Sequence, residues 1–336
     1  MMGKKATIKD VARFSGVSIA TVSLVLNGNA HKFSPATVAK VIEAKKELNY
    51  SPNYFAQRMV IKGSKTIGVM LSDIANPFFG QLMTGVEKAL YQENFVTVLC
   101  NANFDMTKEH DYLEELMRRG VDGFIIATPV ISNKALCEML HGNNHPFIVI
   151  DQNRTEGAID SVVSDDFEGG RLAAEHLLGL GHKQLAIVMP VEGPENLQNR
   201  LRGFRAACKN QVETVTILDT SMNKSGGYAV AKQVVETKAT GVFAINDETA
   251  FGLYRGLEDL GKSIPEDYSV IGYDDVEMCE YVTPRLTTIA QPIEELGEAA
   301  AQLLMKRIKE PDKEAEDISL PVTLIERHST RVLSGK

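Results

Sequence analysis

The sequence predicts an α/β protein in which a three-helix, helix-turn-helix headpiece precedes a two-lobed, doubly wound α/β domain. Residues 7–48 repeat apolar residues at helical spacing and contain a tight turn, which is typical of short packed helices. From residue 66 onwards, short β-rich runs alternate with amphipathic segments, which predicts parallel sheets. With 336 residues, the chain is long enough for two or three domains.

Charge is distributed unevenly along the chain. Residues 1–63 contain ten Lys or Arg and three Asp or Glu, a net charge of +7, although the whole chain carries −8. A basic N-terminal arm on an acidic protein indicates that this end meets a polyanion. The alternative is a solvated, Lys-rich surface without a partner.

The first two headpiece helices are joined by a short turn. The first is predicted over residues 7–15, with Val11 and Ala12 facing inward, and Gly16 supplies the permissive backbone of the turn. Ser18 is suited to cap the second helix. The buried side of the second helix is predicted to consist of Val17, Val22, Val25 and Leu26.

The third helix is predicted from its start signal. Ser34 is placed to cap it, and Pro35 occupies the first helical position, where no N–H is needed. Its apolar stripe is predicted to consist of Val38, Val41, Ile42 and Leu48.

The outer side of the second helix is small and rich in hydroxyl groups, because it carries Ser18, Ala20, Thr21 and Ser23. The second helix of a helix-turn-helix unit lies in the DNA major groove. Small side chains let its backbone approach closely, and hydroxyls with helix-start N–H groups hold phosphates. The charge, the turn and this face favour DNA binding over an ordinary three-helix bundle without a ligand.

The large domain is predicted from alternating runs. Helices are expected over residues 77–94, 107–119, 132–142, 168–180, 196–209, 226–237 and 248–260. The strand runs are TIGVML, FVTVLCNA, VDGFIIAT and PFIVID, then, after residue 160, SVVSDD, QLAIVMP, VTILD, GVFAIND and YSVIGYDD. Two such units in tandem predict two lobes with a cleft, and SVVSDD is assigned to the second. Ligands of these sheets lie beyond the carboxyl ends of the strands.

Polar side chains stand at those carboxyl ends. They come from SDIANPFF after the first strand, from the ends of PFIVID, GVFAIND and VIGYDD, and from NRLRGF and TTIAQP. Carboxylate, amide and guanidinium groups beside two phenylalanines suit a sugar, whose hydroxyls need donors and acceptors and whose apolar face packs on aromatic rings. Each residue alone is also typical of a loop cap, so the shared placement carries the prediction.

Two stretches make the sequence resemble a known family. TIKDVARFSGVSIATVSLVLNG and ELNYSPNYFAQRM resemble the DNA-binding headpiece of the LacI/GalR family of bacterial transcription regulators. The resemblance implies a headpiece at 1–50, a hinge helix and linker at 51–65, and an effector-binding and dimerisation domain at 66–336, of the periplasmic sugar-binding type. It places the N-lobe at about 66–160 and 292–320, and the C-lobe at about 161–291 and 321–332.

The resemblance also implies which residues meet DNA. Ile19 and Ala20 stand at base-reading positions, whereas Leu24 occupies a position that is commonly basic, so no Arg takes a guanine there. The hinge folds on DNA, and Met59 stands where an apolar wedge enters the minor groove. The implied DNA-binding residues are Thr7, Ser18, Ile19, Ala20, Thr21, Ser23, Asn27, Asn53, Tyr54 and Met59.

The motifs NPFF, RLRGF, INDE, IGYDD and TTIAQP resemble the pentose-binding branch of the family, in particular ribose repressors. Gln152 stands where ribose binders have Arg, and Met222 stands where an aromatic ring often stacks on the sugar. The implied effector-binding residues are Ser72, Asn76, Phe78, Phe79, Asp151, Arg200, Asn246, Asp274 and Gln291.

Other function classes find little support. The sequence has no G-x-S-x-G elbow and no G-x-x-x-x-G-K-[ST] loop, and neither the seven histidines nor the four cysteines show metal-ligand spacing. It has no secretory signal and no run long enough to span a membrane. We therefore expect a cytoplasmic, non-enzymatic repressor without cofactor or metal.

Its expected partners are a near-palindromic DNA operator and a small sugar effector. We also expect a homodimer, since no heptad repeat for a tetramer follows the large domain. Two rivals stay open: an enzyme fused to a DNA-binding module, and a catabolite-control regulator whose corepressor is a phosphorylated carrier protein.

Overall fold

A computed structural model describes residues 6–51, 63–129, 131–151 and 159–333 of the chain. The chain forms two compact units, residues 1–64 and 65–336, which we call the headpiece and the large domain. The predicted fold class is confirmed, because the headpiece is helical and the large domain is built on two α/β sheets.

The headpiece contains three α-helices and one 3-10 turn among its described residues. They are α1 (Ile8–Ser15), α2 (Ile19–Leu26), η1 (Ala30–Lys32) and α3 (Pro35–Glu47). Gly16 ends α1 with a left-handed φ of 70°, and the turn to α2 follows. The buried centre consists of Val11, Ala12, Val22, Val25, Val41, Ala44 and Tyr50.

One headpiece prediction is wrong. Ile42 was expected in the apolar stripe of α3, but its side chain is 49% exposed. Val41 of the predicted stripe is buried, and Ala44, which was not predicted, is buried with it. Successive residues on a helix point about 100° apart, so Ile42 turns away from the face on which Val41 and Ala44 lie.

The first sheet of the large domain is parallel throughout, in the order β11-β5-β4-β3-β1-β2. Its strands are β1 (Thr66–Leu71), β2 (Val96–Asn101), β3 (Gly123–Ala127), β4 (Phe147–Ile150), β5 (Asp160–Ser164) and β11 (Asp317–Leu320). Its flanking helical elements are α5 (Pro77–Gln92), α6 (Met106–Arg119), α7 (Asn133–Leu140), η2 (His141–Asn143) and α12 (Ile293–Lys309).

The second sheet has the order β12-β10-β9-β8-β6-β7, in which only the β10–β12 pair is antiparallel. Its strands are β6 (Gln184–Met189), β7 (Thr214–Asp219), β8 (Gly241–Ala244), β9 (Ser269–Asp274), β10 (Thr287–Ala290) and β12 (Thr323–Ile325). Its helical elements are α8 (Asp166–Gly179), α9 (Glu195–Cys208), α10 (Lys224–Glu236), α11 (Asp247–Asp259) and η3 (Glu277–Glu280).

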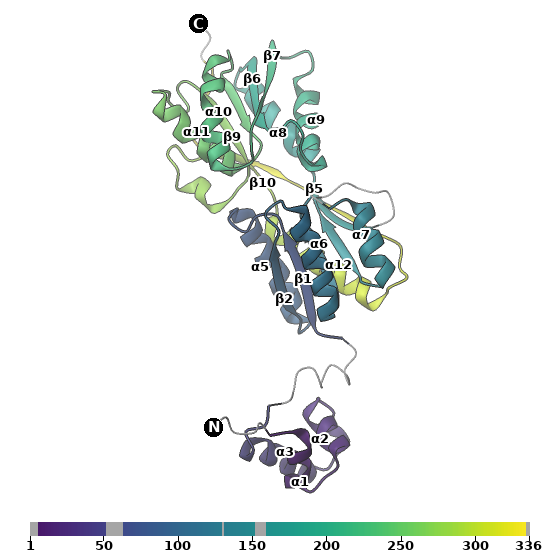
Figure 1. Ribbon diagram of the computed structural model, residues 1–336. Helices are drawn as coiled ribbons and strands as arrows, with labels where there is room; N and C mark the ends of the chain where they lie inside the picture. Colours follow the sequence, from purple (N-terminus) through teal and green to yellow (C-terminus); the bar gives the residue numbers. More distant parts are fainter. Residues whose placement is uncertain (1–5, 52–62, 130, 152–158, 334–336) are drawn as a thin grey trace. The chain divides into compact units, whose positions relative to one another are not determined.

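The lobe boundary differs from the predicted one at SVVSDD. This run forms β5, which pairs with β4 and β11 in the first sheet rather than opening the second. Among the described residues, the N-lobe therefore comprises 65–129, 131–151, 159–164 and 293–320, and the C-lobe comprises 165–290 and 321–333. The described chain passes between the lobes near residues 165, 291 and 321, and Figure 1 shows the yellow helix α12 back among the elements of the N-lobe.

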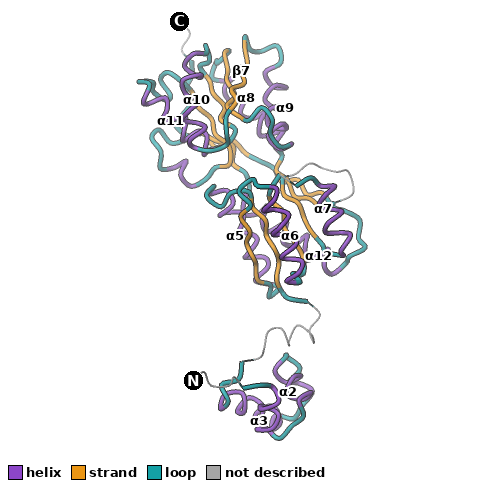
Figure 2. Tube along the Cα trace, in the orientation of Figure 1, coloured by secondary structure: helices purple, strands orange, loops and turns teal. Residues whose placement is uncertain are grey.

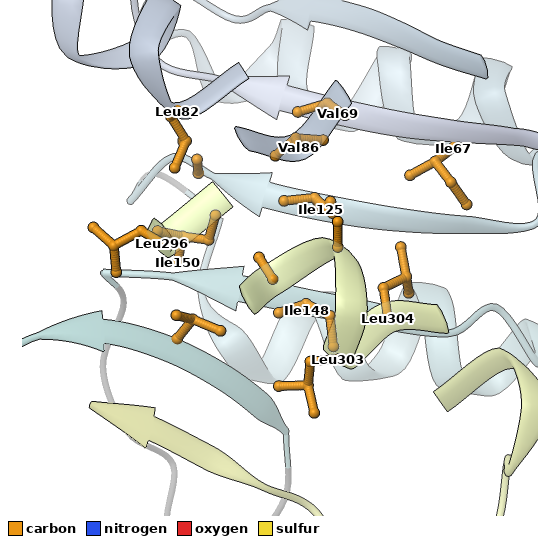
Figure 3. Close-up of a cluster of buried hydrophobic side chains, with 14 of the residues drawn as sticks. Ile67, Val69, Leu82, Val86, Ile125, Ile148, Ile150, Leu296, Leu303 and Leu304 are labelled. Atoms are coloured by element: carbon orange, nitrogen blue, oxygen red, sulfur yellow. The ribbon is translucent and has the colours of Figure 1, made fainter. Parts of the chain in front are cut away.

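Apolar side chains from the sheet and from two helices form the centre of the N-lobe. Ile67, Val69 and Ile125 on the strands belong to one cluster with Leu82 of α5 and Leu304 of α12, and Figure 3 shows these side chains. Since α5 and α12 lie far apart in the sequence, this cluster ties the two segments of the lobe together.

Helices pack in close pairs beside the sheets (Figure 2). In the α8–α9 pair, a Cβ on Gly203 would lie 1.8 Å from the carbonyl oxygen of Phe167, and a Cβ on Gly170 would lie 1.9 Å from that of Arg200. Glycines at matching positions also let α10 approach α11, and α5 approach α12, at backbone distance. The backbones therefore touch, and the backbone of Arg200 is held in a notch of α8.

Candidate functional site

The N-terminal end of α2 is the exposed part of that helix. Ser18, Ile19 and Ala20 are exposed, and no acidic residue occupies its first turn. The Ser18 hydroxyl oxygen accepts the Thr21 N–H at 3.0 Å, so Ser18 caps α2 as predicted. Because no carboxylate neutralises this end, its N–H groups and positive dipole stay open to a phosphate.

The other predicted DNA-binding residues of the headpiece also hold local structure. Thr7 donates its backbone N–H and its hydroxyl to the Asp10 carboxylate at 2.9 and 2.7 Å. The Asn27 amide donates to the Ser23 hydroxyl at 3.3 Å. The Ser23 hydroxyl accepts in its contact and so keeps its hydrogen for a backbone phosphate, whereas Thr7 has committed both its N–H and its hydroxyl hydrogen to Asp10. Asn53, Tyr54 and Met59 lie outside the described residues.

A cavity of about 390 Å³ lies between the lobes of the large domain. All nine predicted effector residues line it: Ser72, Asn76, Phe78, Phe79, Asp151, Arg200, Asn246, Asp274 and Gln291. The parallel topology explains this placement, because the carboxyl ends of β1, β4, β8 and β9 face one another across the cleft.

Arg200 is the cation of the cavity, and its side chain is held rigidly. Its Nε donates to Asp166 Oδ1 at 2.8 Å and its Nη1 to the carbonyl oxygen of Ile245 at 2.7 Å. Its guanidinium lies 3.5 Å from the ring centroid of Tyr273, whose hydroxyl also donates to Asp166 at 3.1 Å. Only 3% of Arg200 is exposed, so little conformational entropy remains to be lost on binding.

Three carboxyl groups surround this single cation. Burial and, to a smaller extent, the neighbouring Asp166 raise the pKa of Asp151 to about 7. Burial also raises the pKa values of Asp166 and Asp274, although Arg200 opposes both shifts. Since one guanidinium faces three carboxyls, the cavity holds no excess of positive charge.

Asp274 and Gln291 form a pair at the passage between the lobes. Gln291 Nε2 donates to Asp274 Oδ1 at 2.7 Å. Gln291 is 7% exposed, and its Oε1 has no hydrogen-bond partner within the described residues. An unpaired buried polar atom costs about 1–3 kcal/mol, so this wall of the cavity has a polar group for a ligand to satisfy.

Two predicted asparagines begin helices. Asn76 accepts the Phe78 N–H at 3.0 Å ahead of Pro77. Asn246 accepts the Thr249 N–H at 3.0 Å and donates to the Met222 carbonyl at 3.2 Å. The Asn246 side-chain oxygen is thus used in the helix cap, and one of its two amide hydrogens is used by the Met222 carbonyl. The second amide hydrogen is left for a ligand.

The two phenylalanines differ in their surroundings. Their rings pack edge to face with centroids 5.2 Å apart. Phe78 belongs to the N-lobe hydrophobic cluster, whereas Phe79 is half-buried and packs against that cluster from outside. Phe79 therefore has the more accessible ring for the apolar face of a ligand.

Other residues of the cavity wall were not predicted. They are Asp73, Phe104, Ala127, Thr128, Pro129, Ile150, Pro190, Pro194, Asn196, Leu197, Thr220, Ser221 and Asn223, together with Met222. Their place in the sequence could have identified some of them, because residues that follow strands lie at the cleft. Phe104 follows β2, Thr128 follows β3, Pro190 follows β6 and Thr220 follows β7. Behind this wall, the buried carboxylate of Glu109 accepts the Thr128 hydroxyl, and it accepts the Ile131 N–H at 2.9 Å.

The described part of the chain shows neither a metal-ligating cluster nor a membrane-spanning helix. No group of three or more His, Cys, Asp or Glu side chains there is arranged to hold a metal ion. No helix there is both long and apolar enough to cross a lipid bilayer.

Known proteins share both parts of this architecture. Residues 7–53 match the family "Bacterial regulatory proteins, lacI family", and residues 174–330 match the periplasmic binding protein-like domain. The chain is 34% identical, over 98% of its length and 99% of the relative's, to the HTH-type transcriptional repressor PurR of Vibrio cholerae.

Solved structures agree with these matches. A LacI family transcriptional regulator from Enterococcus faecalis with bound ribose is 54% identical, with a TM-score of 0.76 over 80% of this chain and all of that one. The lac repressor dimer bound to operator and an anti-inducer is 28% identical, with a TM-score of 0.87 over 98% of this chain and all of that one.

A helix-turn-helix headpiece followed by a two-lobed domain with a polar cavity defines a ligand-responsive DNA-binding transcription regulator. The chain belongs to the LacI family of bacterial regulatory proteins.

Proposed function

We propose that this protein is a cytoplasmic, non-enzymatic repressor whose operator affinity is controlled by a neutral pentose, ribose, bound between its lobes. The observation that carries the proposal is the convergence of nine polar and aromatic side chains, from segments scattered between residues 72 and 291, on one cavity. The ribose-bound regulator that is 54% identical supports ribose as the sugar.

The charges of the cavity favour a neutral ligand. Arg200 is already paired with Asp166, and Asp151 and Asp274 lie nearby without a second cation in the described wall. Carboxyl groups form hydrogen bonds with sugar hydroxyls, whereas a phosphate or a sugar acid would add negative charge to a buried site in which one guanidinium already faces three carboxyl groups. Phe79 offers the aromatic face that a sugar ring needs, although Met222 replaces an aromatic at another position.

The operator-binding form is proposed to be a homodimer. Strand β2 lies at the edge of the first sheet, and Val96, Val98 and Leu99 are 66%, 38% and 38% exposed on it. An exposed apolar edge strand promotes aggregation unless another segment covers it. The exposed side chains of β2 therefore support an interface with a second copy of the chain at this edge. The lac repressor structure, which is a dimer bound to operator, supports a dimer as the operator-binding form.

Binding to DNA is expected to require two half-sites and to depend steeply on salt. Because two basic headpieces displace counterions, affinity for the operator should fall by about 10³-fold between about 50 and 200 mM salt. A near-palindromic operator should bind at least about 10³-fold more tightly than random duplex. Fluorescence anisotropy with both duplexes across a salt series measures this, and equal affinities would contradict the repressor function.

Ribose is expected to bind to the full chain in calorimetry, and ribose 5-phosphate and ribonate at least about tenfold more weakly, because each adds a negative charge beside the carboxylates. Unchanged sugar after incubation would agree with a non-enzymatic role, whereas turnover would favour the enzyme alternative. Absence of binding by any neutral sugar would contradict the proposal and favour regulation by a phosphorylated carrier protein.

A further inference from the structure

Asp247 is a fully buried carboxylate that lies behind the cavity and is not part of its wall. It is the first residue of α11, directly after Asn246. Its Oδ1 accepts the Thr288 hydroxyl at 2.6 Å. Its Oδ2 accepts the Val276 N–H at 3.0 Å and the Cys279 thiol at 3.1 Å.

The backbone next to Val276 adopts an unusual conformation. Asp274 has a φ of 123° and Asp275 a φ of 63°, both in the region that favours glycine. Residues with such backbones persist only where neighbouring groups hold them, and they cluster at ligand sites. The hydrogen bond from the Val276 N–H to Asp247 fixes the end of this turn, and Gln291 holds the Asp274 side chain from the other side.

The structure makes room for Asp247 in particular. A Cβ on Gly272 of β9 would lie 2.1 Å from Asp247 Oδ1, so the strand carries no side chain at that point. Burial raises the pKa of Asp247 to about 6, and its hydrogen bonds from Thr288, Val276 and Cys279 oppose this shift. Arg327 pairs with the adjacent Asp275 at 2.8 Å, so Asp247 has no cation of its own among these contacts.

A buried, unpaired carboxylate is costly, so a purely space-filling role would favour an apolar residue here. The three donors that meet at Asp247 come from β10, from the turn after β9 and from η3. The two acceptor oxygens of a carboxylate are enough to join all three. The segment so joined is the one that presents Asp274 to the cavity.

We propose that Asp247 is a positioning residue for the effector: it fixes the turn at Asp275 and Val276 and thereby aims the Asp274 carboxylate into the cavity. This inference rests on the proposed function, because it takes the cavity to be the ribose site. Asp247 itself touches no ligand. It acts through the backbone of its neighbours.

The test compares ribose affinity, operator affinity without ribose, and unfolding temperature for variants of the full chain. Asp247→Ala is expected to weaken ribose binding about tenfold or more, because the turn loses its anchor, with operator affinity unchanged. Asp247→Asn should lose less, since its amide oxygen still accepts the Val276 N–H while its amide hydrogens face the Thr288 hydroxyl. The matched control Thr288→Val removes another Asp247 hydrogen bond but leaves the turn, so it should lower stability without weakening ribose binding.

Wild-type ribose affinity in Asp247→Ala would overturn the inference. If that variant does not fold, wild-type affinity in Asp247→Leu, which fills the volume but offers no acceptor to the Val276 N–H, would do the same. A loss in Thr288→Val as large as that in Asp247→Ala would also overturn it, because general loss of stability would then explain both. A wild-type protein that does not bind ribose would overturn the proposed function first, so the two failures are distinguishable.

Discussion

Replacing Asp274 by alanine is expected to leave the ribose-free protein bound to its operator but to remove its response to ribose. Asp274 is 4% exposed, and its side chain carries the acceptor for Gln291 Nε2. The change leaves sugar hydroxyls and Gln291 unpaired in a desolvated cleft, a loss of about 1–3 kcal/mol, or about 5- to 150-fold in ribose affinity. Operator anisotropy with and without ribose measures the response.

The operator response to ribose disappears because ribose binding and DNA binding are coupled only through the arrangement of the two lobes. A ligand held by both lobes favours one arrangement of the lobes, and it shifts DNA binding only by its differential affinity for the two arrangements, typically ~1–3 kcal/mol. A ligand that no longer binds at working concentration shifts nothing. Asp274→Asn is the matched control, because asparagine adopts a positive φ more readily than alanine and keeps an acceptor for Gln291. A mutant Asp274→Ala that responds at the wild-type ribose concentration would remove Asp274 from the site.

Gly203→Ala is expected to destabilise the large domain strongly. The new Cβ would lie 1.8 Å from the Phe167 carbonyl oxygen and 3.0 Å from the Arg171 nitrogen, both backbone atoms that give way only if α8 and α9 separate. We expect a loss of about 3 kcal/mol or more in the free energy of unfolding. This corresponds to a fall of about 6–12 °C in unfolding temperature, which calorimetry measures.

Gly179→Ala in the same helix pair is the matched control. A Cβ there meets no atom within 4 Å, so relief of the glycine entropy cost should stabilise the domain by up to about 1 kcal/mol. Gly203 also lies one helical turn after Arg200, so Gly203→Ala should weaken ribose binding in the fraction that folds. Equal unfolding temperatures for the two variants would show that α8 and α9 leave room for a methyl group at Gly203, which would contradict the close backbone contact.

Helix boundaries were predictable because their signals are local. Asn76 followed by Pro77, and Ser34 followed by Pro35, mark helix starts through side-chain caps and a fixed proline φ, and both helices begin at the proline. The cavity residues were predictable for a related reason. Parallel strands bring their carboxyl ends to one edge, so polar residues after strands converge whatever the details of packing.

Pairing over long distances was not predictable in the same way. The run at Asp160–Ser164 suits either sheet, and only its hydrogen bonds with β4 and β11 decide that it belongs to the first. Ile42 and Val41 are adjacent and equally apolar, and only the angle at which α3 meets the other headpiece helices decides which is buried.

The sequence by itself determined the two-part architecture, the caps, and the fact that polar groups gather at the strand ends that face the cleft, because these follow from periodicity and from the order of strands and helices. The tertiary structure alone decided that Arg200 pairs with Asp166 and stacks on Tyr273, and that Asp247 lies behind the wall rather than in it. The physical reason is that a side chain's partners and burial depend on segments far away in the chain, whereas its backbone conformation depends mainly on its neighbours.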